Sequence, residues 1–273
     1  MWQVDNRTPF AAERGWVRDR DGAEIWLVAV KASFDIRPDG STEVSKEQPP
    51  VLRMAEHHGE PGKSSIKYES DLVLTKKTTD VIVVGHACAP EGLAVTHTDA
   101  GFKLGPIQKL LRVTGDRTWS GFGAIACHWQ PRAGYAGTYD DQWMKTRQPL
   151  LAEDLDDRYF QCAPADQQAP EFLRGGEAVI LHNLHPRGRI QFTLPKLYLG
   201  FETRFYDGSR EWHKNRRLHT VILEPDFPRV SLVWHSALPC HFKVQKLERT
   251  IVTLKTDIST GEREPDDSEL EFA

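Results

Sequence analysis

The 273-residue sequence has no long hydrophobic run. A membrane-spanning helix needs an apolar stretch of about 18 residues or more, and no segment reaches that length. The first residues, Met1-Trp2-Gln3-Val4-Asp5-Asn6, lack a basic region followed by an apolar stretch, so no secretory signal is predicted. Both absences favour a cytoplasmic protein with no membrane partner.

Cysteine is scarce, and its spacing matches no known framework. The four cysteines are Cys88, Cys127, Cys162 and Cys240, and none belongs to a CxxC pair. In a cytoplasmic protein this favours reduced thiols that pack as small apolar residues. A zinc site usually needs four ligands at recognisable spacing. Only His86, together with Cys88, Cys127 and Cys240, approaches such a set, so we predict neither a metal nor a cofactor.

Motifs for covalent catalysis and phosphate binding are also missing. The sequence has no GxSxG elbow, no SxxK and no glycine-rich loop ending in Lys-Ser or Lys-Thr. Carboxylate pairs do occur at 140–141, 153–154 and 156–157, and the chain has eight tryptophans. Paired acids beside aromatic side chains are typical of glycan-cleaving clefts. A non-enzymatic protein is the favoured interpretation, and a carbohydrate-active or carbohydrate-binding β-sandwich stays open as the alternative.

Positive charge is not in excess. The formal net charge is -4 and the sequence pI is about 6.3, whereas proteins that hold nucleic acid usually carry a basic surplus. The densest basic cluster, residues 212–217, is short and is interpreted as a solvated strand end. We therefore predict no nucleic-acid partner.

Strand-like segments dominate what is present. Residues 24–36 are rich in β-branched and aromatic side chains and follow the turn Arg20-Asp21-Gly22. Residues 80–87 form an apolar run typical of a strand buried on both faces. Further strands are predicted at 93–98, 108–113, 178–181, 189–194, 197–205, 217–223, 229–234 and 241–254. Turns at intervals of 8–12 residues predict a mainly β fold, an antiparallel β-sandwich or a barrel-like core.

The middle of the chain breaks the strand pattern. Residues 139–147 predict one short central helix, capped by Thr138 or Asp140 and ended by Pro149. It belongs to a long central loop segment, 131–176. We predict a single β-rich domain over residues 1–255, or two β halves, about 1–130 and 177–255, joined by that segment. Residues 256–273 are acidic, with little apolar surface, and predict a disordered tail.

Aromatic and arginine side chains gather in and before the central segment. Both residue types are enriched at protein-binding hot spots, because they combine contact area with directional hydrogen bonds. The candidate binding residues are Arg117, Trp119, Arg132, Tyr139, Trp143, Arg147, Arg158 and Tyr159. Packing of the segment onto the β core is an equally good interpretation. Trp143, in mid-helix among polar neighbours, is expected to be mainly structural.

The same segments carry a family resemblance. They are Arg18–Gly22 leading into Trp26–Phe34, then Tyr68–Leu72, Lys76, Thr79–Val81 and Gly85–Ala87, then Lys109–Trp119, Ala136–Asp140, Trp143, Arg147–Leu150, Asp154, Asp156, Arg158–Phe160, Ala163–Pro164, Asp166–Gln168 and Arg174–Glu177. With these motifs the chain resembles the bacterial family catalogued as domain of unknown function 2169. The resemblance covers about residues 16–199, and its most specific tract is 136–168.

This resemblance implies a function in bacterial type VI secretion. It implies an adaptor or chaperone that couples a toxic effector to the VgrG–PAAR spike, with a protein partner and no catalytic residues. Loading of the effector before secretion fits a cytoplasmic location.

Overall fold

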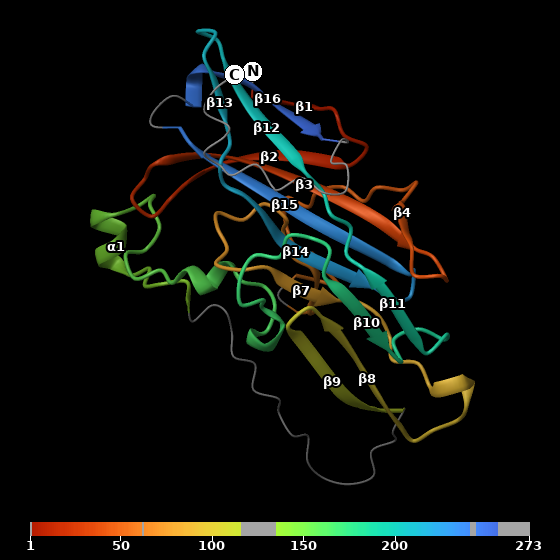
Figure 1. Ribbon diagram of the computed structural model, residues 1–273. Coiled ribbons are helices and arrows are strands. Elements are labelled where there is room, and N and C mark those ends of the chain that lie inside the picture. The colour runs from red at the N-terminus through yellow and green to blue at the C-terminus, as the bar shows by residue number, and fades with distance from the viewer. Residues whose placement is uncertain (1, 62, 116–134, 241–243, 256–273) are drawn as a thin grey trace.

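Figure 1 shows the computed structural model, which describes residues 2–61, 63–115, 135–240 and 244–255. Its largest sheet, called the large sheet here, has the strand order β2-β3-β15-β14-β7, with β4 paired to β3. Its strands are β2 (Ala11–Arg18), β3 (Glu24–Ile36), β4 (Thr42–Val44), β7 (Asp80–Val83), β14 (Arg216–Glu224) and β15 (Arg229–Pro239). Because β3 pairs with β15 along its length, strands from both halves of the chain share this sheet.

Two four-stranded sheets accompany the large sheet, at the top and the bottom of Figure 1. The terminal sheet contains β1 (Gln3–Asn6), β16 (Leu247–Leu254), β12 (Leu199–Phe205) and β13 (Arg210–Trp212). The hairpin sheet contains β11 (Arg189–Thr193), β10 (Ala178–His182), β8 (His97–Leu104) and β9 (Ile107–Thr114). A small ladder joins β5 (Glu56–His57) to β6 (Ile66–Tyr68).

Short helices complete the described chain. They are α1 (Asp141–Thr146) and the 3₁₀ turns η1 (Pro90–Gly92), η3 (Asp157–Phe160), η4 (Ala165–Gln167) and η5 (Val244–Lys246). None of the helices in the described ranges has the length and apolar character needed to cross a membrane. The mainly β prediction is confirmed, and the described strands form no closed barrel. The pairs β1–β16 and β7–β14 are parallel, so the sheets are mixed and not purely antiparallel.

The hydrophobic core lies on one face of the large sheet. Alternate residues of β3, such as Trp26, Val30 and Phe34, join one apolar cluster with Phe201 of the terminal sheet and Leu181 of the hairpin sheet. Successive side chains of a strand point to opposite faces, so this alternation places both smaller sheets on the same side. The arrangement is that of a sandwich.

The opposite face of the large sheet is also buried, but it carries polar side chains. Lys31 points to this face and donates to Asp71 at 3.0 Å, with both side chains buried. Farther along the sheet, the rings of His219 and His235 stack with centroids 4.4 Å apart. The irregular segments before β7 and after α1 supply the partners that cover this face. Most buried polar groups are hydrogen-bonded, as Lys31 is here, whereas Nδ1 of His219 and Nε2 of His235 have no hydrogen-bond partner among the described residues.

The predicted strand at 24–36 coincides with β3. The prediction for 93–98 is wrong over most of its length, because residues 93–96, which follow η1, belong to no strand and β8 begins only at His97. The strand expected over 80–87 ends at Val83. His86 and Cys88 therefore lie after the strand and do not share one of its faces.

Candidate functional site

The residues from Tyr135 to Arg174, called the central segment here, lie against the polar face of the large sheet. Their one α-helix begins at Asp141, two residues after the start of the predicted range 139–147, and Asp140, one of the two predicted caps, accepts the Trp143 backbone N–H at 2.8 Å. A second acid, Asp154, accepts both the N–H and the hydroxyl of Thr138. Each of these acids accepts a backbone N–H that a helix end or turn leaves without a partner, and this stabilises the local conformation of the central segment.

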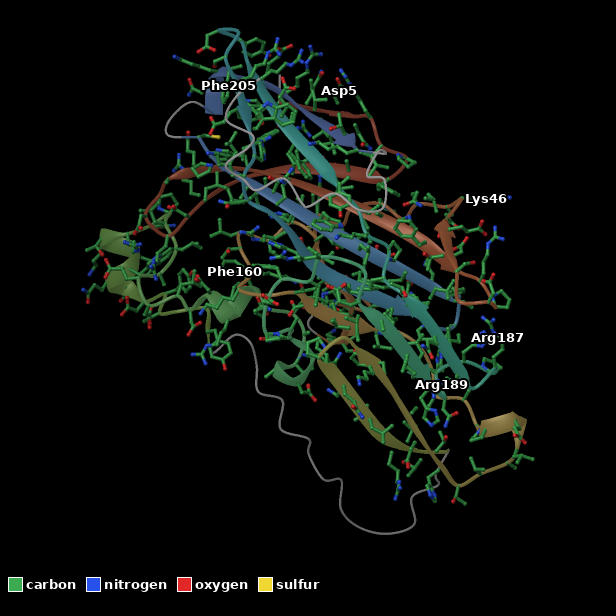
Figure 2. All side chains as sticks on the ribbon, viewed as in Figure 1. Asp5, Lys46, Phe160, Arg187, Arg189 and Phe205 are labelled. Carbon is green, nitrogen blue, oxygen red and sulfur yellow. The ribbon has the colours of Figure 1, made fainter. Side chains whose placement is uncertain are left out.

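A cleft of about 530 Å³ opens between the central segment and the large sheet. One wall comes from β2 and from the loop before β7, with Val17, Leu72 and Leu74. The other wall comes from the central segment, with Ala136, Tyr139, Leu151, Leu155, Tyr159 and Phe160. Figure 2 labels Phe160 on the central segment, close to the large sheet. The lining is mostly apolar, with Arg18 and Glu69 as charged members.

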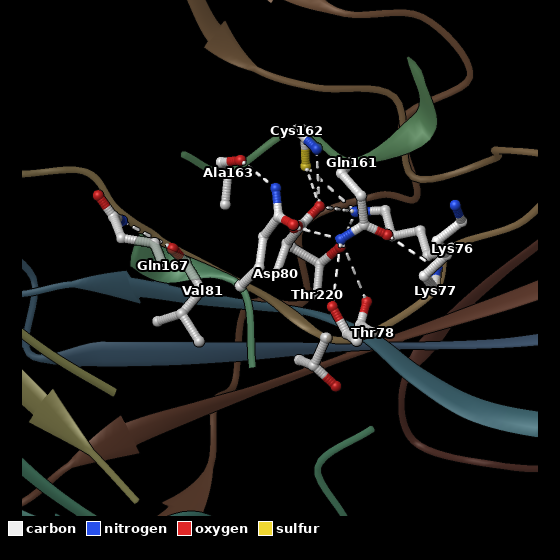
Figure 3. A network of polar contacts seen from close by, with 12 residues as sticks. Lys76, Lys77, Thr78, Asp80, Val81, Gln161, Cys162, Ala163, Gln167 and Thr220 are labelled. Carbon is white, nitrogen blue, oxygen red and sulfur yellow. Dashed lines mark hydrogen bonds and ion pairs between the residues drawn. The ribbon is translucent and has the colours of Figure 1, made fainter. Parts of the chain in front are cut away.

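A buried ionic network lies where the cleft meets the sheet (Figure 3). The Lys76 ammonium donates to the Asp80 carboxylate at 2.6 Å and to the Thr220 hydroxyl at 2.8 Å. The thiol of Cys162, which also lines the cleft, lies 3.0 Å from Asp80 and 3.1 Å from Lys76. Gln161 donates to the other oxygen of Asp80 at 2.8 Å. The network joins the central segment to β7 and β14.

Burial and charge set the protonation of this network. Burial raises the pKa of the Cys162 thiol to about 12, with the Lys76 and Asp80 charges as opposing smaller influences. The thiol therefore stays protonated at neutral pH and acts as a hydrogen-bond donor to Asp80. Burial also disfavours the ammonium of Lys76, but the Asp80 carboxylate, with the Cys162 sulfur as a further hydrogen-bond acceptor, outweighs it and raises its pKa. The network is a charged clamp, and its thiol is not activated as a nucleophile.

The structure brings two of the predicted binding residues into the cleft. Tyr139 and Tyr159 line it, and their side chains remain 46% and 38% exposed. Trp143 packs edge-on against Tyr139, with the ring centroids 4.8 Å apart, and its indole N–H donates to the Leu150 carbonyl at 3.0 Å. Trp143 thus contacts Tyr139 of the cleft wall and bonds to the chain that follows α1.

The two arginines of the central segment both bond to other groups of the protein. Arg147 donates to the backbone carbonyls of Leu151 and Arg20, which ties the segment to the β2–β3 turn. Arg158 pairs with Asp156 at 2.6 Å, and its guanidinium lies 4.3 Å from the Tyr135 ring centroid. The other predicted residues, Arg117, Trp119 and Arg132, lie outside the described residues, as does the predicted tail 256–273.

Replacing Arg147 with lysine is expected to loosen the central segment and not to unfold the sheets. A lysine ammonium cannot reach two carbonyls with the planar fork of a guanidinium, so about 1–3 kcal/mol of local stability is lost. Limited proteolysis should cut within the central segment faster than in the wild type, while the thermal midpoint falls by only a few degrees. Arg189→Lys, at an exposed position on β11, is the matched control. Equal cleavage rates in the two variants would contradict the assignment.

Three of the acids in the carboxylate pairs that suggest glycan chemistry bond to nearby groups of the chain. Asp140, Asp154 and Asp156 cap backbone groups or pair with Arg158. Among the described residues, no three His, Cys, Asp or Glu side chains are grouped to hold a metal ion. His86 lies 2.7 Å from Asp226, and Cys240 is buried, whereas Cys127 is outside the described ranges.

Sequence reasoning missed the ionic network and one wall of the cleft. Lys76 and Asp80 belong to the segments that carry the family resemblance, and a carboxylate at the start of an apolar run is a signal of a buried charge. Cys162 gave no such signal, because its partners lie more than 80 positions away. Leu72 stands out in the sequence only as the end of the motif Tyr68–Leu72, and Leu74 does not stand out at all, because the packing partners of a loop leucine come from distant segments.

Comparison with known proteins gives one match. A family model described as "Uncharacterized protein conserved in bacteria (DUF2169)" matches residues 21–121 and 120–235. The matched ranges include every residue of the ionic network and all of the cleft lining except Val17 and Arg18 of β2. No curated protein and no solved structure matches the chain.

Proposed function

Because the chain belongs to the bacterial DUF2169 family, we propose that it is a non-enzymatic adaptor or chaperone for type VI secretion. In this proposal it binds a toxic effector in the cytoplasm and helps to load it onto the VgrG–PAAR spike. The effector's N-terminal region, a transmembrane segment or a PAAR-like domain is the bound part. Shielding such an apolar segment until it docks prevents its aggregation.

The observation that carries the proposal is the apolar cleft between β2 and the central segment. The tract with the most specific family resemblance, 136–168, builds one whole wall of this cleft. Its exposed rings, Tyr139 and Tyr159, are of the residue type that dominates binding energy at protein interfaces. Trp143 and Arg147 hold that wall in place before any partner arrives. A preorganised wall reduces the entropy cost of binding.

The cleft chemistry also supports binding over catalysis. The titratable group that reaches the cleft from the ionic network is the Cys162 thiol, whose pKa burial raises to about 12. A thiol protonated at neutral pH is a poor nucleophile. The mainly apolar lining suits the side chains of a polypeptide segment, and Arg18 and Glu69 offer charged contacts to it.

Replacing Tyr159 with alanine is expected to weaken effector binding at least tenfold, because a ring at the centre of an interface contributes about 1–2 kcal/mol or more. The protein would be co-expressed with the product of each flanking gene, and the affinity of any complex measured by calorimetry alongside a melting curve. Tyr206→Ala is the matched control, since Tyr206 is a 56% exposed ring on the β12–β13 turn, away from the cleft.

Two results would count against the proposal in different ways. If no flanking gene product binds the wild-type protein, the adaptor function is wrong. If a product binds, and Tyr159→Ala binds it as tightly as Tyr206→Ala does, the cleft is not the interface.

A further inference from the structure

The strand β9 is an unusually open edge of the hairpin sheet. It ends the strand order β11-β10-β8-β9, and Figure 1 shows it at the lower end of the molecule. Three of its large apolar side chains are exposed, Leu110 by 59%, Leu111 by 54% and Val113 by 38%. Val95, 44% exposed, lies at the same end, with its carbonyl beside Gly115. Exposed apolar side chains clustered at one edge mark an interaction site.

The backbone register shows which groups of β9 are free to pair. β8 and β9 pair without a register shift from Leu104–Ile107 to His97–Thr114. Just beyond, the Gly115 N–H donates to the Thr96 carbonyl at 3.1 Å. Hydrogen-bonded pairs alternate with non-bonded pairs in an antiparallel ladder. The backbone N–H and C=O groups of the odd-numbered β9 residues therefore bond to β8, and those of the even-numbered residues point away from β8, toward the open edge.

The outward-pointing residues are Gln108, Leu110, Arg112 and Thr114. Within the ranges that the structure describes, no further strand pairs with them. A row of unpaired N–H and C=O groups is a template for another extended chain.

The usual protection of an edge strand is absent from this part of β9. Proteins blunt such edges with proline, a bulge or an outward lysine. β9 contains no proline and no bulge. Its two cations turn toward the protein itself, because Lys109 donates to Asp166 at 3.0 Å and Arg112 to Asp99 at 2.8 Å. Within the residues that the structure describes, the end from Leu110 to Thr114 therefore carries none of these protections.

We propose that the β9 edge binds an extended segment of a protein partner by strand addition. Successive side chains of a strand lie on opposite faces, so apolar residues of that segment pack on Leu111 and Val113 on one face, and its intervening acidic residues face Arg112 on the other. This inference rests on the proposed function, since an adaptor holds two proteins and needs a second surface. β9 belongs to a different sheet from β2, which forms the cleft, so both surfaces can be occupied together.

Charge favours a partner over a second copy of the chain. β9 carries Lys109 and Arg112 and no acidic residue. Pairing two β9 strands about a two-fold axis places both Arg112 side chains on the same face of the joined strands, and like charges on facing strands are destabilising. An acidic segment has the opposite effect. Arg112 is 67% exposed despite its pair with Asp99, and exposed pairs are weak, so it remains able to contact a partner's acid.

The test uses two short peptides that alternate valine with glutamate or valine with lysine, each titrated onto the full chain. The Val–Glu peptide is expected to bind at least tenfold more tightly than the Val–Lys peptide, because each well-placed charge pair contributes up to about 1 kcal/mol. Leu110→Pro should abolish this binding, whereas Leu110→Ala should weaken it less. Both variants lose the leucine, but only proline removes the outward N–H, and an edge strand tolerates proline at such a position.

The same variants are then titrated with any flanking gene product that binds the wild type, and melting curves and molar masses are recorded. If that product binds Leu110→Pro as tightly as Leu110→Ala, and neither peptide distinguishes the two, the strand-addition inference is wrong while the adaptor function stands. If the Val–Glu peptide binds at β9 but no flanking product binds anywhere, the adaptor function fails and the edge site stands. A doubled mass that Leu110→Pro abolishes would identify a second copy as the occupant and overturn the partner assignment.

Discussion

Asp80→Ala is expected to destabilise the protein by about 3–5 kcal/mol, because it leaves the Lys76 ammonium buried without its counter-ion. The Lys76 side chain is 2% exposed and that of Asp80 is fully buried. The substitution also removes the acceptor for Cys162 and Gln161. Urea denaturation followed by tryptophan fluorescence gives the free energy of unfolding. Asp39→Ala, at an exposed turn aspartate, is the control and should change it by less than about 1 kcal/mol.

A double variant separates charge from shape at this site. Lys76→Met with Asp80→Leu removes both charges while keeping most of the volume, and such replacements of a buried pair are often neutral or stabilising. We expect it to recover at least half of the stability that Asp80→Ala loses. If Asp80→Ala is as stable as Asp39→Ala, the ionic network does not stabilise the attachment of the central segment to the large sheet.

Acid is expected to destabilise the fold below about pH 6.5, through three buried histidines. Burial, with the Arg216 charge as a smaller cause, lowers the pKa of His213 to about 4. Burial, with a smaller influence of Lys76, lowers that of His235 to about 3. Burial also holds the pKa of His219 well below its usual value, assisted by the neighbouring His235. All three rings are therefore mainly neutral in the folded protein between pH 6.5 and 5.

The sign of the effect follows from proton uptake by the unfolded chain. An unfolded histidine takes up a proton as the pH falls through about 6.5, whereas the folded ring does so only near its lowered pKa. Stability is therefore present above about pH 6.5 and is lost as the pH falls toward the folded values. Each histidine contributes a loss of about 2 kcal/mol between pH 6.5 and 5.

The measurement is the urea midpoint at half-unit pH steps, for the wild type and for His213→Gln. The His213 ring bonds the Thr203 and Ser236 hydroxyls, both at 2.7 Å, so the variant is less stable throughout. The informative quantity is the slope against pH, which should become shallower than in the wild type. His58→Gln, at an exposed histidine, should leave the slope unchanged. A wild-type slope of zero between pH 6.5 and 5 would contradict the buried neutral state.

Local signals predict the elements well and their contacts poorly. β3 was predictable from its β-branched and aromatic residues and the turn before it. Lys31, within that strand, looks like a solvated position, and only its bond to Asp71, 40 positions later, explains its burial. The helix cap at Asp140 was predictable because its partner, Trp143, is three residues away. Cys162 was not, because every group that gives it a role comes from a distant segment.

The candidate site follows the same division. The aromatic and arginine content of the central segment predicts a binding or packing role for it. The structure shows two different sets of contacts within the segment. Tyr139 and Tyr159 face the cleft, while Trp143 and Arg147 hold backbone carbonyls. Composition alone could not divide them, because the same residue types serve packing and recognition. The open edge of β9 was also invisible in the sequence, since an alternating strand looks the same in the middle of a sheet and at its edge.

Hydrogen exchange of the protein with and without a bound effector tests the central claim most directly. If the cleft holds the effector, the backbone amides of residues 69–74 and 136–160 should exchange more slowly in the complex. The turn at residues 206–209, away from the cleft, should exchange at an unchanged rate. Protection in both cleft walls is the result expected. A complex that forms with no added protection in either wall would contradict the assignment of the cleft as the effector-binding surface.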